Sequence, residues 1–239
     1  MARNRVGIYG GTFDPVHNGH INVARGIIDA FGFDELLFVP AFVPPHKREQ
    51  MISAGFHRFA MLVIATESEP EMRVSTIELE LPSKPYTVET LTRLQANDPQ
   101  SQLFFVMGAD SFAEITSWRE YERLLMSYSI VVAVRPQNSG HWSVDTGQGQ
   151  ESAIAEDEGD PGLHLPSHLR ERIVDLRGAR CPSRGELDEQ HIFLTDYVLS
   201  DVAATRIREL IRSGCDASAL LPRGVDDYAI KYGIYDLRA

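Results

Sequence analysis

Short apolar runs alternate along this chain with longer stretches in which apolar residues recur every three or four positions. The short runs are rich in β-branched and aromatic residues, as are strands buried on both faces of a parallel sheet. They cover residues 6–9, 36–39, 103–107, 130–134 and 191–194. The periodic stretches predict helices over residues 19–31, 56–67, 87–96 and 205–213, with a last helix before Tyr235. Strands that alternate with helices form right-handed βαβ units, so the sequence predicts an α/β protein with a doubly wound parallel sheet.

Two regions fit this alternation less well. Residues 72–79 are expected to be extended. Between residues 137 and 190 the periodicity fades, and residues 139–162 are rich in Gly, Ser, Asp and Glu. We expect an irregular acidic excursion over 137–190, with a short helix within 166–176, on a single domain that spans residues 1–239. The sequence leaves open whether this excursion is a lid, a partner surface or an inert insertion.

Composition narrows the functional classes. The 239 residues include 34 acidic and 23 basic side chains, a net charge of −11, which argues against a nucleic-acid partner. Cys181 and Cys215 have the spacing of neither a disulfide framework nor a metal site. No stretch reads as a signal peptide or a membrane span, so we expect a cytoplasmic protein with no membrane partner. A homo-oligomer is compatible with all of these features.

The most informative segment follows the first predicted strand, at residues 10–20, with the sequence Gly-Gly-Thr-Phe-Asp-Pro-Val-His-Asn-Gly-His. The two glycines are expected to let the backbone turn tightly and to leave room for a phosphate group near the amides. His17 and His20 are three residues apart where a helix begins, so their side chains share one face. A helix N-terminus also favours anions, so the segment predicts a phosphate site.

This segment differs from two common phosphate loops. The third glycine of the dinucleotide fingerprint is absent, and no Gly-Lys-Ser/Thr of a Walker loop follows. An isolated His-x-x-His usually caps a helix or lies exposed on a surface. Here the motif follows a strand and a glycine pair, and this position favours a functional role. We interpret Asp14 as a residue that stabilises the turn rather than as a metal ligand, and no protein metal site is predicted.

Five further motifs follow predicted strands or precede predicted helices. They are Pro44-Pro45-His46-Lys47, Pro85-Tyr86-Thr87-Val88, Gly108-Ala109-Asp110-Ser111, Ser117-Trp118-Arg119 and Val134-Arg135-Pro136. Together with His17-Asn18-Gly19-His20, this ordered set resembles the bacterial nicotinate-nucleotide adenylyltransferases, members of the HxGH nucleotidyltransferase superfamily. The resemblance covers residues 5–136 and 191–235 and implies the Rossmann-like sheet of that superfamily.

The resemblance implies a reaction in which the 5′-phosphate of nicotinate mononucleotide attacks the α-phosphorus of ATP, giving deamido-NAD and pyrophosphate. The attacking oxygen is already anionic, so the protein's task is to position the phosphates and neutralise developing charge. The residues implied for that task are His17, His20, Lys47 and Arg208. Mg²⁺ would arrive with ATP and be held largely by the phosphates and water.

The same resemblance implies the binding residues. Those expected to contact ATP are Gly10, Gly11, Thr12, Phe13, Gly19, Arg135 and Thr205. Those expected to contact nicotinate mononucleotide are Tyr86, Thr87, Gly108, Asp110 and Trp118. Trp118 would stack on the nicotinate ring, and Asp110 would accept hydrogen bonds from ribose, cap a helix, or do both. The amides of Tyr86 and Thr87 would face the nicotinate carboxylate and favour the acid over its amide.

The chain departs from the family pattern at one phosphate motif. Two adjacent serines are expected before Thr205, with an arginine three residues after it, but Ala203 and Ala204 stand in their place while Arg208 is retained. Each lost hydroxyl contact to a charged oxygen costs about 1.5–3 kcal/mol. Ser200 or Asp201 would be the alternative helix cap.

This departure keeps several functions open. One is an active adenylyltransferase with a weakened or rearranged triphosphate site, and another is a catalytically silent nucleotide-binding protein. Other acceptors, such as nicotinamide mononucleotide or phosphopantetheine, form a third possibility, and cytidylyl transfer in place of adenylyl transfer is a fourth. The phosphopantetheine enzymes typically have threonine at the first histidine position, so His17 argues against that acceptor.

Overall fold

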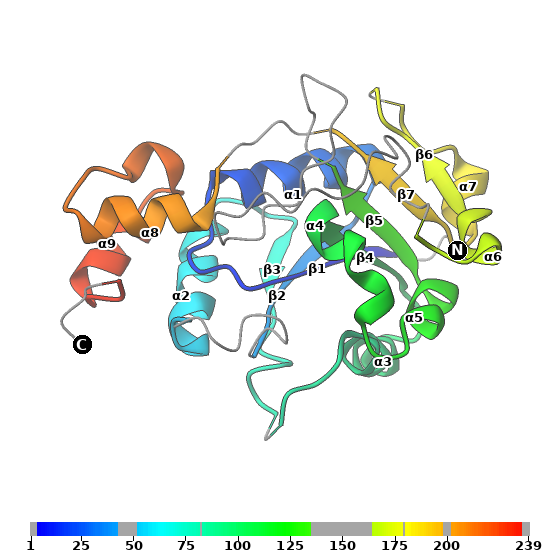
Figure 1. The fold of residues 1–239 in the computed structure, drawn as a ribbon, viewed down its shortest axis with the longest axis horizontal. Coiled ribbons are helices and arrows are strands. Elements are labelled where there is room, and N and C mark those ends of the chain that lie inside the picture. The colour runs from blue at the N-terminus through cyan, green and yellow to red at the C-terminus, as the bar shows by residue number, and fades with distance from the viewer. Residues whose placement is uncertain are drawn as a thin grey trace.

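The computed structural model describes residues 4–42, 52–81, 83–134, 164–178, 180–197 and 202–235. Within these ranges seven strands form one sheet in the order β3-β2-β1-β4-β5-β7-β6, and every neighbouring pair is parallel (Figure 1). The strands are β1 (Arg5–Gly11), β2 (Glu35–Pro40), β3 (Met72–Val74), β4 (Gln102–Gly108), β5 (Ser129–Ala133), β6 (Ile173–Asp175) and β7 (Ile192–Thr195). The predicted doubly wound, Rossmann-like parallel sheet is confirmed.

Helices cover the sheet and extend past one of its ends (Figure 1). They are α1 (Asn18–Phe31), α2 (Gly55–Ala65), α3 (Thr87–Asn97), α4 (Ala109–Ala113), α5 (Tyr121–Ser127), α6 (Ser167–Arg170), α7 (Arg184–Asp188), α8 (Ala204–Arg212) and α9 (Val225–Lys231). Figure 1 places α8 and α9 at the opposite end of the molecule from α6 and α7. None of the helices in the described part of the chain has the length and apolar character that a membrane crossing requires.

Alternate side chains of the central strands enter two separate cores. On β4, Phe104 and Val106 join a buried cluster with residues of α1, α2, α8 and α9. Phe105 and Met107 join the other cluster, with residues of α3, α4 and α5. Both faces of the strand are therefore buried, which explains why its sequence is a continuous apolar run rather than an alternating one.

The strand order reverses direction between β1 and β4. The chain leaves β1 through α1 and returns to β2 on one side, whereas β4 and β5 lie on the other side of β1. Ligands of open parallel sheets bind at such a switch point, beyond the carboxyl ends of the strands. Here those ends carry Gly11 on β1 and Gly108 on β4, so the fold brings two of the predicted motifs to one edge.

Predicted and observed elements differ most outside the central strands. The extended segment predicted over 72–79 is a strand only through Val74, because Thr76 then begins a turn in which its carbonyl oxygen accepts from the amide of Leu79. Helices α4 and α5, each seven residues or shorter, were not predicted. Such short elements contain too few turns to produce a visible period.

The second half of the predicted irregular excursion is also structured. Residues 164–178 and 180–190 contain α6, β6 and α7, and β6 pairs with β7 at the edge of the sheet. The expected helix within 166–176 is confirmed for 167–170, but the strand that follows it was missed. This strand has three residues and pairs with a later segment, so no local pattern reveals it. Residues 137–163 lie outside the described part of the chain.

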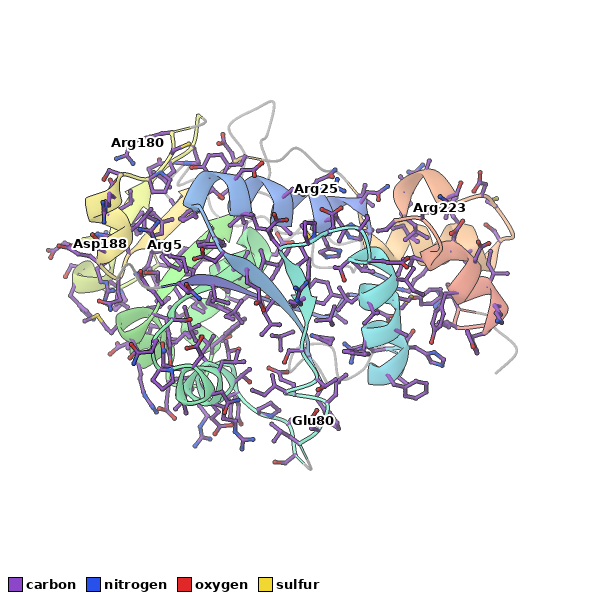
Figure 2. The ribbon with its side chains drawn as sticks, turned by 180° about the vertical axis from the view of Figure 1, so that it is seen from behind. Arg5, Arg25, Glu80, Arg180, Asp188 and Arg223 are labelled. Carbon is purple, nitrogen blue, oxygen red and sulfur yellow. The ribbon has the colours of Figure 1, made fainter. Side chains whose placement is uncertain are left out.

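An ion pair shows where α7 lies relative to β1. Figure 2 shows Arg5 and Asp188 side by side, and Arg5 Nη2 is 3.9 Å from Asp188 Oδ1. Gln102 Nε2 also donates to the carbonyl oxygen of Leu187. The helix α7 therefore lies beside the amino-terminal ends of β1 and β4, at the edge opposite the switch-point loops. The exposed ion pair itself contributes little to stability.

Candidate active site

His17 and His20 stack on each other at the start of α1. His17 is the N-cap residue, with extended backbone (φ −141°, ψ 170°), and its backbone N–H donates to Nδ1 of His20 at 3.2 Å. The ring centroids are 3.7 Å apart and the planes differ by 29°. Because Nδ1 of His20 accepts a hydrogen bond, we assign the proton of the neutral ring to Nε2. The helix cap thus makes Nε2 of His20 a hydrogen-bond donor.

The turn before the histidines is made by Phe13. It has a left-handed φ of 51°, is buried, and places its ring edge-on to that of His20, with centroids 5.0 Å apart. Gly10 and Gly11 belong to β1, so the prediction that they form the tight turn was wrong. A Cβ atom would lie 2.8 Å from the Phe13 ring at position 11 and 3.0 Å from the Phe105 ring at position 10. Close packing of these rings is the physical reason for the two glycines.

Asp14 is a buried acceptor for two distant segments. Its Oδ1 accepts from the hydroxyl of Tyr235 at 2.9 Å, and its Oδ2 accepts from the amide of Ser53 at 3.1 Å. Burial, and next the negative charge of Asp14, raise the pKa of Tyr235. These contacts support the interpretation of Asp14 as a residue that stabilises the turn.

Arg58 is a buried residue of this region that sequence reasoning missed. Its side chain is fully enclosed, and burial lowers the pKa of the guanidinium while the charge of Asp14 opposes that shift. Nη1 donates to the carbonyl oxygen of Thr12 at 2.8 Å, and Nη2 donates to that of Ala41 at 2.6 Å. Nε donates to the carbonyl oxygen of Ser53 at 3.0 Å. One guanidinium therefore joins the loop after β1, the loop after β2 and the segment before α2.

The predicted phosphate motif of α8 meets the histidine loop. Arg208 Nη1 donates to the backbone carbonyl oxygen of Asp14 at 2.7 Å, and Nη2 donates to Oγ1 of Thr205 at 3.3 Å. Asn18 Nδ2 donates to the carbonyl oxygen of Ala219 at 3.1 Å. The structure thus brings His17, His20, Thr205 and Arg208 to one place, although the histidines and Arg208 lie almost two hundred residues apart in the sequence.

The start of α8 has no side-chain cap. Ala203 is the N-cap residue (φ −107°, ψ 130°), Ala204 is the first helical residue, and no side chain accepts from the helix amides there. This agrees with the weak cap expected from the two alanines. The alternative caps, Ser200 and Asp201, lie outside the described residues.

Tyr86 caps α3 and already has a carboxylate partner. Its backbone N–H donates to Oε2 of Glu89 at 3.0 Å, while Thr87 is the first residue of the helix. The amide of Tyr86 was predicted to face the carboxylate of a ligand. In the structure that position is taken by a carboxylate of the chain's own first helical turn.

The segment 117–119 lies next to Tyr86. The ring of Trp118 is half-buried and edge-on to that of Phe105, with centroids 6.4 Å apart. The guanidinium carbon of Arg119 lies 4.9 Å from the centroid of the Tyr86 ring. Two motifs predicted to bind one substrate are therefore in contact with each other.

Gly108 and Asp110 flank the carboxyl end of β4. Gly108 is the N-cap residue of α4, and a Cβ atom added there would meet nothing within 4 Å. Asp110 lies in the first turn of α4. The open space at Gly108 is compatible with the predicted ligand contact.

Two further predicted site residues, Lys47 and Arg135, lie outside the described residues together with their motifs.

A family model described as cytidylyltransferase-like matches residues 8–210. The match spans the sheet, the histidine pair and most of α8. The chain belongs to this cytidylyltransferase-like family of nucleotidyltransferases, and within it to the nicotinate-nucleotide adenylyltransferases, to which its relatives are assigned.

Two of those relatives and one solved structure illustrate the similarity. The chain is 39% identical to the probable nicotinate-nucleotide adenylyltransferase of Mycolicibacterium vanbaalenii, over 88% of this chain and 94% of the relative. It is 32% identical to the protein of that name from Desulfatibacillum aliphaticivorans, over 97% and 99%. The nicotinic acid mononucleotide adenylyltransferase of Plasmodium falciparum, complexed with NaAD, is 18% identical and has the same fold, with a TM-score of 0.65 over 97% of both chains.

Proposed function

We propose that the protein transfers the adenylyl group of ATP to nicotinate mononucleotide, giving deamido-NAD and pyrophosphate. The observation that carries this proposal is the stacked pair of His17 and His20 at the start of α1, joined by Arg208 through the loop at Asp14. Three nitrogenous side chains at a helix N-terminus suit the binding of phosphate groups. The relatives named for this reaction, aligned over nearly the whole chain, supply the acceptor.

The proposed chemistry needs no covalent intermediate and no general base. The attacking phosphate oxygen is anionic before the reaction, so the barrier falls when charge on the α-phosphate and the leaving pyrophosphate is neutralised. We assign this neutralisation to the imidazole N–H groups of His17 and His20, to Arg208 and to Lys47. A guanidinium has five N–H donors, so Arg208 is able to hold Asp14, Thr205 and a phosphate oxygen together.

The nicotinate end of the acceptor is assigned to the segments around Tyr86 and Trp118. Since the Tyr86 amide bonds with Glu89, we assign the contact with the nicotinate carboxylate to the amide of Thr87. The Trp118 ring would stack on the pyridine ring, and Asp110 would accept from ribose hydroxyls. The contacts with ATP are still assigned to Gly10, Gly11, Thr12, Phe13, Gly19 and Thr205.

We propose Mg²⁺ as the divalent cation that accompanies ATP in this family. Among the described residues there is no group of three or more His, Cys, Asp or Glu side chains arranged to hold a metal ion. Both carboxylate oxygens of Asp14 accept hydrogen bonds. We therefore expect phosphate oxygens and water to be the ligands of Mg²⁺. The bound ion would neutralise part of the phosphate charge. A cytoplasmic location and a homo-oligomer stay predictions.

The test measures pyrophosphate release by the purified protein with ATP and Mg²⁺. Nicotinate mononucleotide, nicotinamide mononucleotide and phosphopantetheine are offered separately as acceptors, and ATP binding is followed by calorimetry. We expect the fastest turnover with nicotinate mononucleotide. ATP binding without turnover of any acceptor would support a silent nucleotide-binding protein, for which Ala203 and Ala204 give a reason. Faster turnover of the amide would overturn the acid preference.

A further inference from the structure

The Arg119 side chain is held on the rim of the nicotinate site by an aromatic ring. Its guanidinium carbon lies 4.9 Å from the centroid of the Tyr86 ring, and Tyr86 as a whole is 40% exposed. Such a cation–π contact orients a guanidinium without neutralising its charge. Arg119 directly follows Trp118, so its position is also tied to the residue proposed to stack on the pyridine ring.

The acidic neighbour of Arg119 is shared with a second arginine. Arg119 Nε is 3.8 Å from Oε1 of Glu120, whereas Arg123 Nη1 donates to Oε2 of the same carboxylate at 2.8 Å. The bond to Arg123 is the shorter one, so Glu120 is engaged mainly with α5. The Arg119 guanidinium keeps most of its positive potential for groups near Tyr86.

The positive charge of Arg119 becomes important when the carboxylate of a ligand approaches the carboxylate of Glu89. The Glu89 carboxylate accepts from the amide of Tyr86, in the first turn of α3. A nicotinate carboxylate bound at the amide of Thr87, the next residue, would lie close to this like charge and be repelled. The amide analogue carries no charge and would not be repelled. An amide site of this kind therefore needs a nearby cation before it can prefer the acid.

We infer that the Arg119 guanidinium, oriented by the Tyr86 ring, is the specificity-determining group that makes the site prefer a nicotinate carboxylate to a nicotinamide group. This inference rests on the proposed function, since it concerns the acceptor of that reaction. Arg119 acts through charge at the rim and takes no part in the transfer at the α-phosphorus. Its loss is expected to act on acceptor binding and thus on KM rather than on kcat.

The experiment compares kcat/KM for nicotinate mononucleotide and nicotinamide mononucleotide in the full-length protein and its variants. Arg119→Ala is expected to lower the ratio of acid to amide about three- to tenfold, through KM for the acid, because an exposed charge contributes modestly. Arg119→Lys keeps the charge and should retain part of the preference. The matched control is Arg180→Ala, which removes an arginine of similar exposure that pairs with Glu186 rather than with Glu120 and should leave the ratio unchanged.

A second pair of variants tests the role of the ring. Tyr86→Phe keeps the aromatic face under the guanidinium and should preserve the ratio, whereas Tyr86→Leu removes it and should lower the ratio. An unchanged ratio in Arg119→Ala, or an equal fall in Arg180→Ala, would overturn the inference while leaving the proposed function intact. No turnover of either acceptor by the wild-type protein would overturn both.

Discussion

The backbone amide of His17 donates to Nδ1 of His20, so the residue that caps α1 also sets the tautomer of the next histidine. A helix cap usually satisfies an amide and does no more. Here the same bond turns Nε2 of His20 into a donor, which is the form that a phosphate oxygen accepts from. Local helix geometry and the proposed chemistry therefore depend on one contact.

Removing Arg58 is expected to destabilise the protein and disturb the loops at the switch point. Arg58→Met leaves the carbonyl oxygens of Thr12 and Ala41 without a buried donor and removes one of the positive charges near Asp14. We expect the free energy of unfolding to fall by about 3–5 kcal/mol, measured by urea titration. Arg58→Lys keeps the charge but not the three-way donor geometry, so it should lose less.

An exposed arginine provides the control for Arg58. Arg25 on α1, labelled in Figure 2, pairs with Glu69 at 2.5 Å, yet its side chain is 53% exposed. Arg25→Met should change the free energy of unfolding by about 1 kcal/mol or less. Equal effects of the two substitutions would contradict the conclusion that Arg58 stabilises the fold by joining three loop segments.

The burial of the Tyr235 hydroxyl, together with its contact with Asp14, predicts a pH dependence at high pH. The pKa of Tyr235 is raised in the folded protein, so its stabilising effect is complete below about pH 10, where the unfolded chain also keeps the proton. Above that pH the unfolded chain loses its proton first, and stability falls. Tyr235→Phe should therefore be less stable than wild type by about 1–3 kcal/mol at pH 8, and this difference should shrink as the pH rises to 11.

The measurement for Tyr235 is a series of urea titrations of both proteins between pH 8 and pH 11. The comparison removes the contribution of other tyrosines, such as Tyr197, whose pKa burial raises to about 12. Parallel pH profiles for wild type and Tyr235→Phe would show that Tyr235 is not coupled to Asp14.

Serine at the two alanine positions of α8 should have separable effects. Position 203 is the N-cap, so Ala203→Ser should raise the free energy of unfolding by about 1 kcal/mol through a new cap. Position 204 is the first helical residue, and Ala204→Ser would add a hydroxyl next to Thr205. We expect this second variant to lower KM for ATP in steady-state kinetics. Unchanged kinetics of Ala204→Ser would mean that another group already fills the role.

The sequence was informative wherever one residue pattern repeats locally. The buried central strands, such as β4, are continuous apolar runs, and their predicted bounds agree with the structure to within one or two residues. The strand β6 escaped prediction, because it is short and forms only through pairing with the later strand β7. The glycines at positions 10 and 11 were recognised as important, but their reason, the rings of Phe13 and Phe105, depends on tertiary packing.

The sequence named candidate residues for this site but not the contacts between them. The motifs predicted the approach of Arg208 to the histidine loop, whereas Arg58 gave no signal because a single arginine in a helix usually faces solvent. The bond between Tyr86 and Glu89 changes which amide is assigned to the ligand. Such contacts depend on side-chain placement across elements, which residue patterns do not specify.

The most direct measurement of the central claim is the rate of deamido-NAD formation from ATP, Mg²⁺ and nicotinate mononucleotide by wild type and by His20→Ala, followed by chromatography. The matched control is His168→Ala, at an exposed histidine on α6 at the far end of the molecule from α8 and α9 (Figure 1). We predict that wild type and the control form deamido-NAD at the same rate. His20→Ala, with its folding verified by circular dichroism, should show a kcat lower by about 100- to 1,000-fold. Deamido-NAD formation by His20→Ala at the wild-type rate would contradict the account.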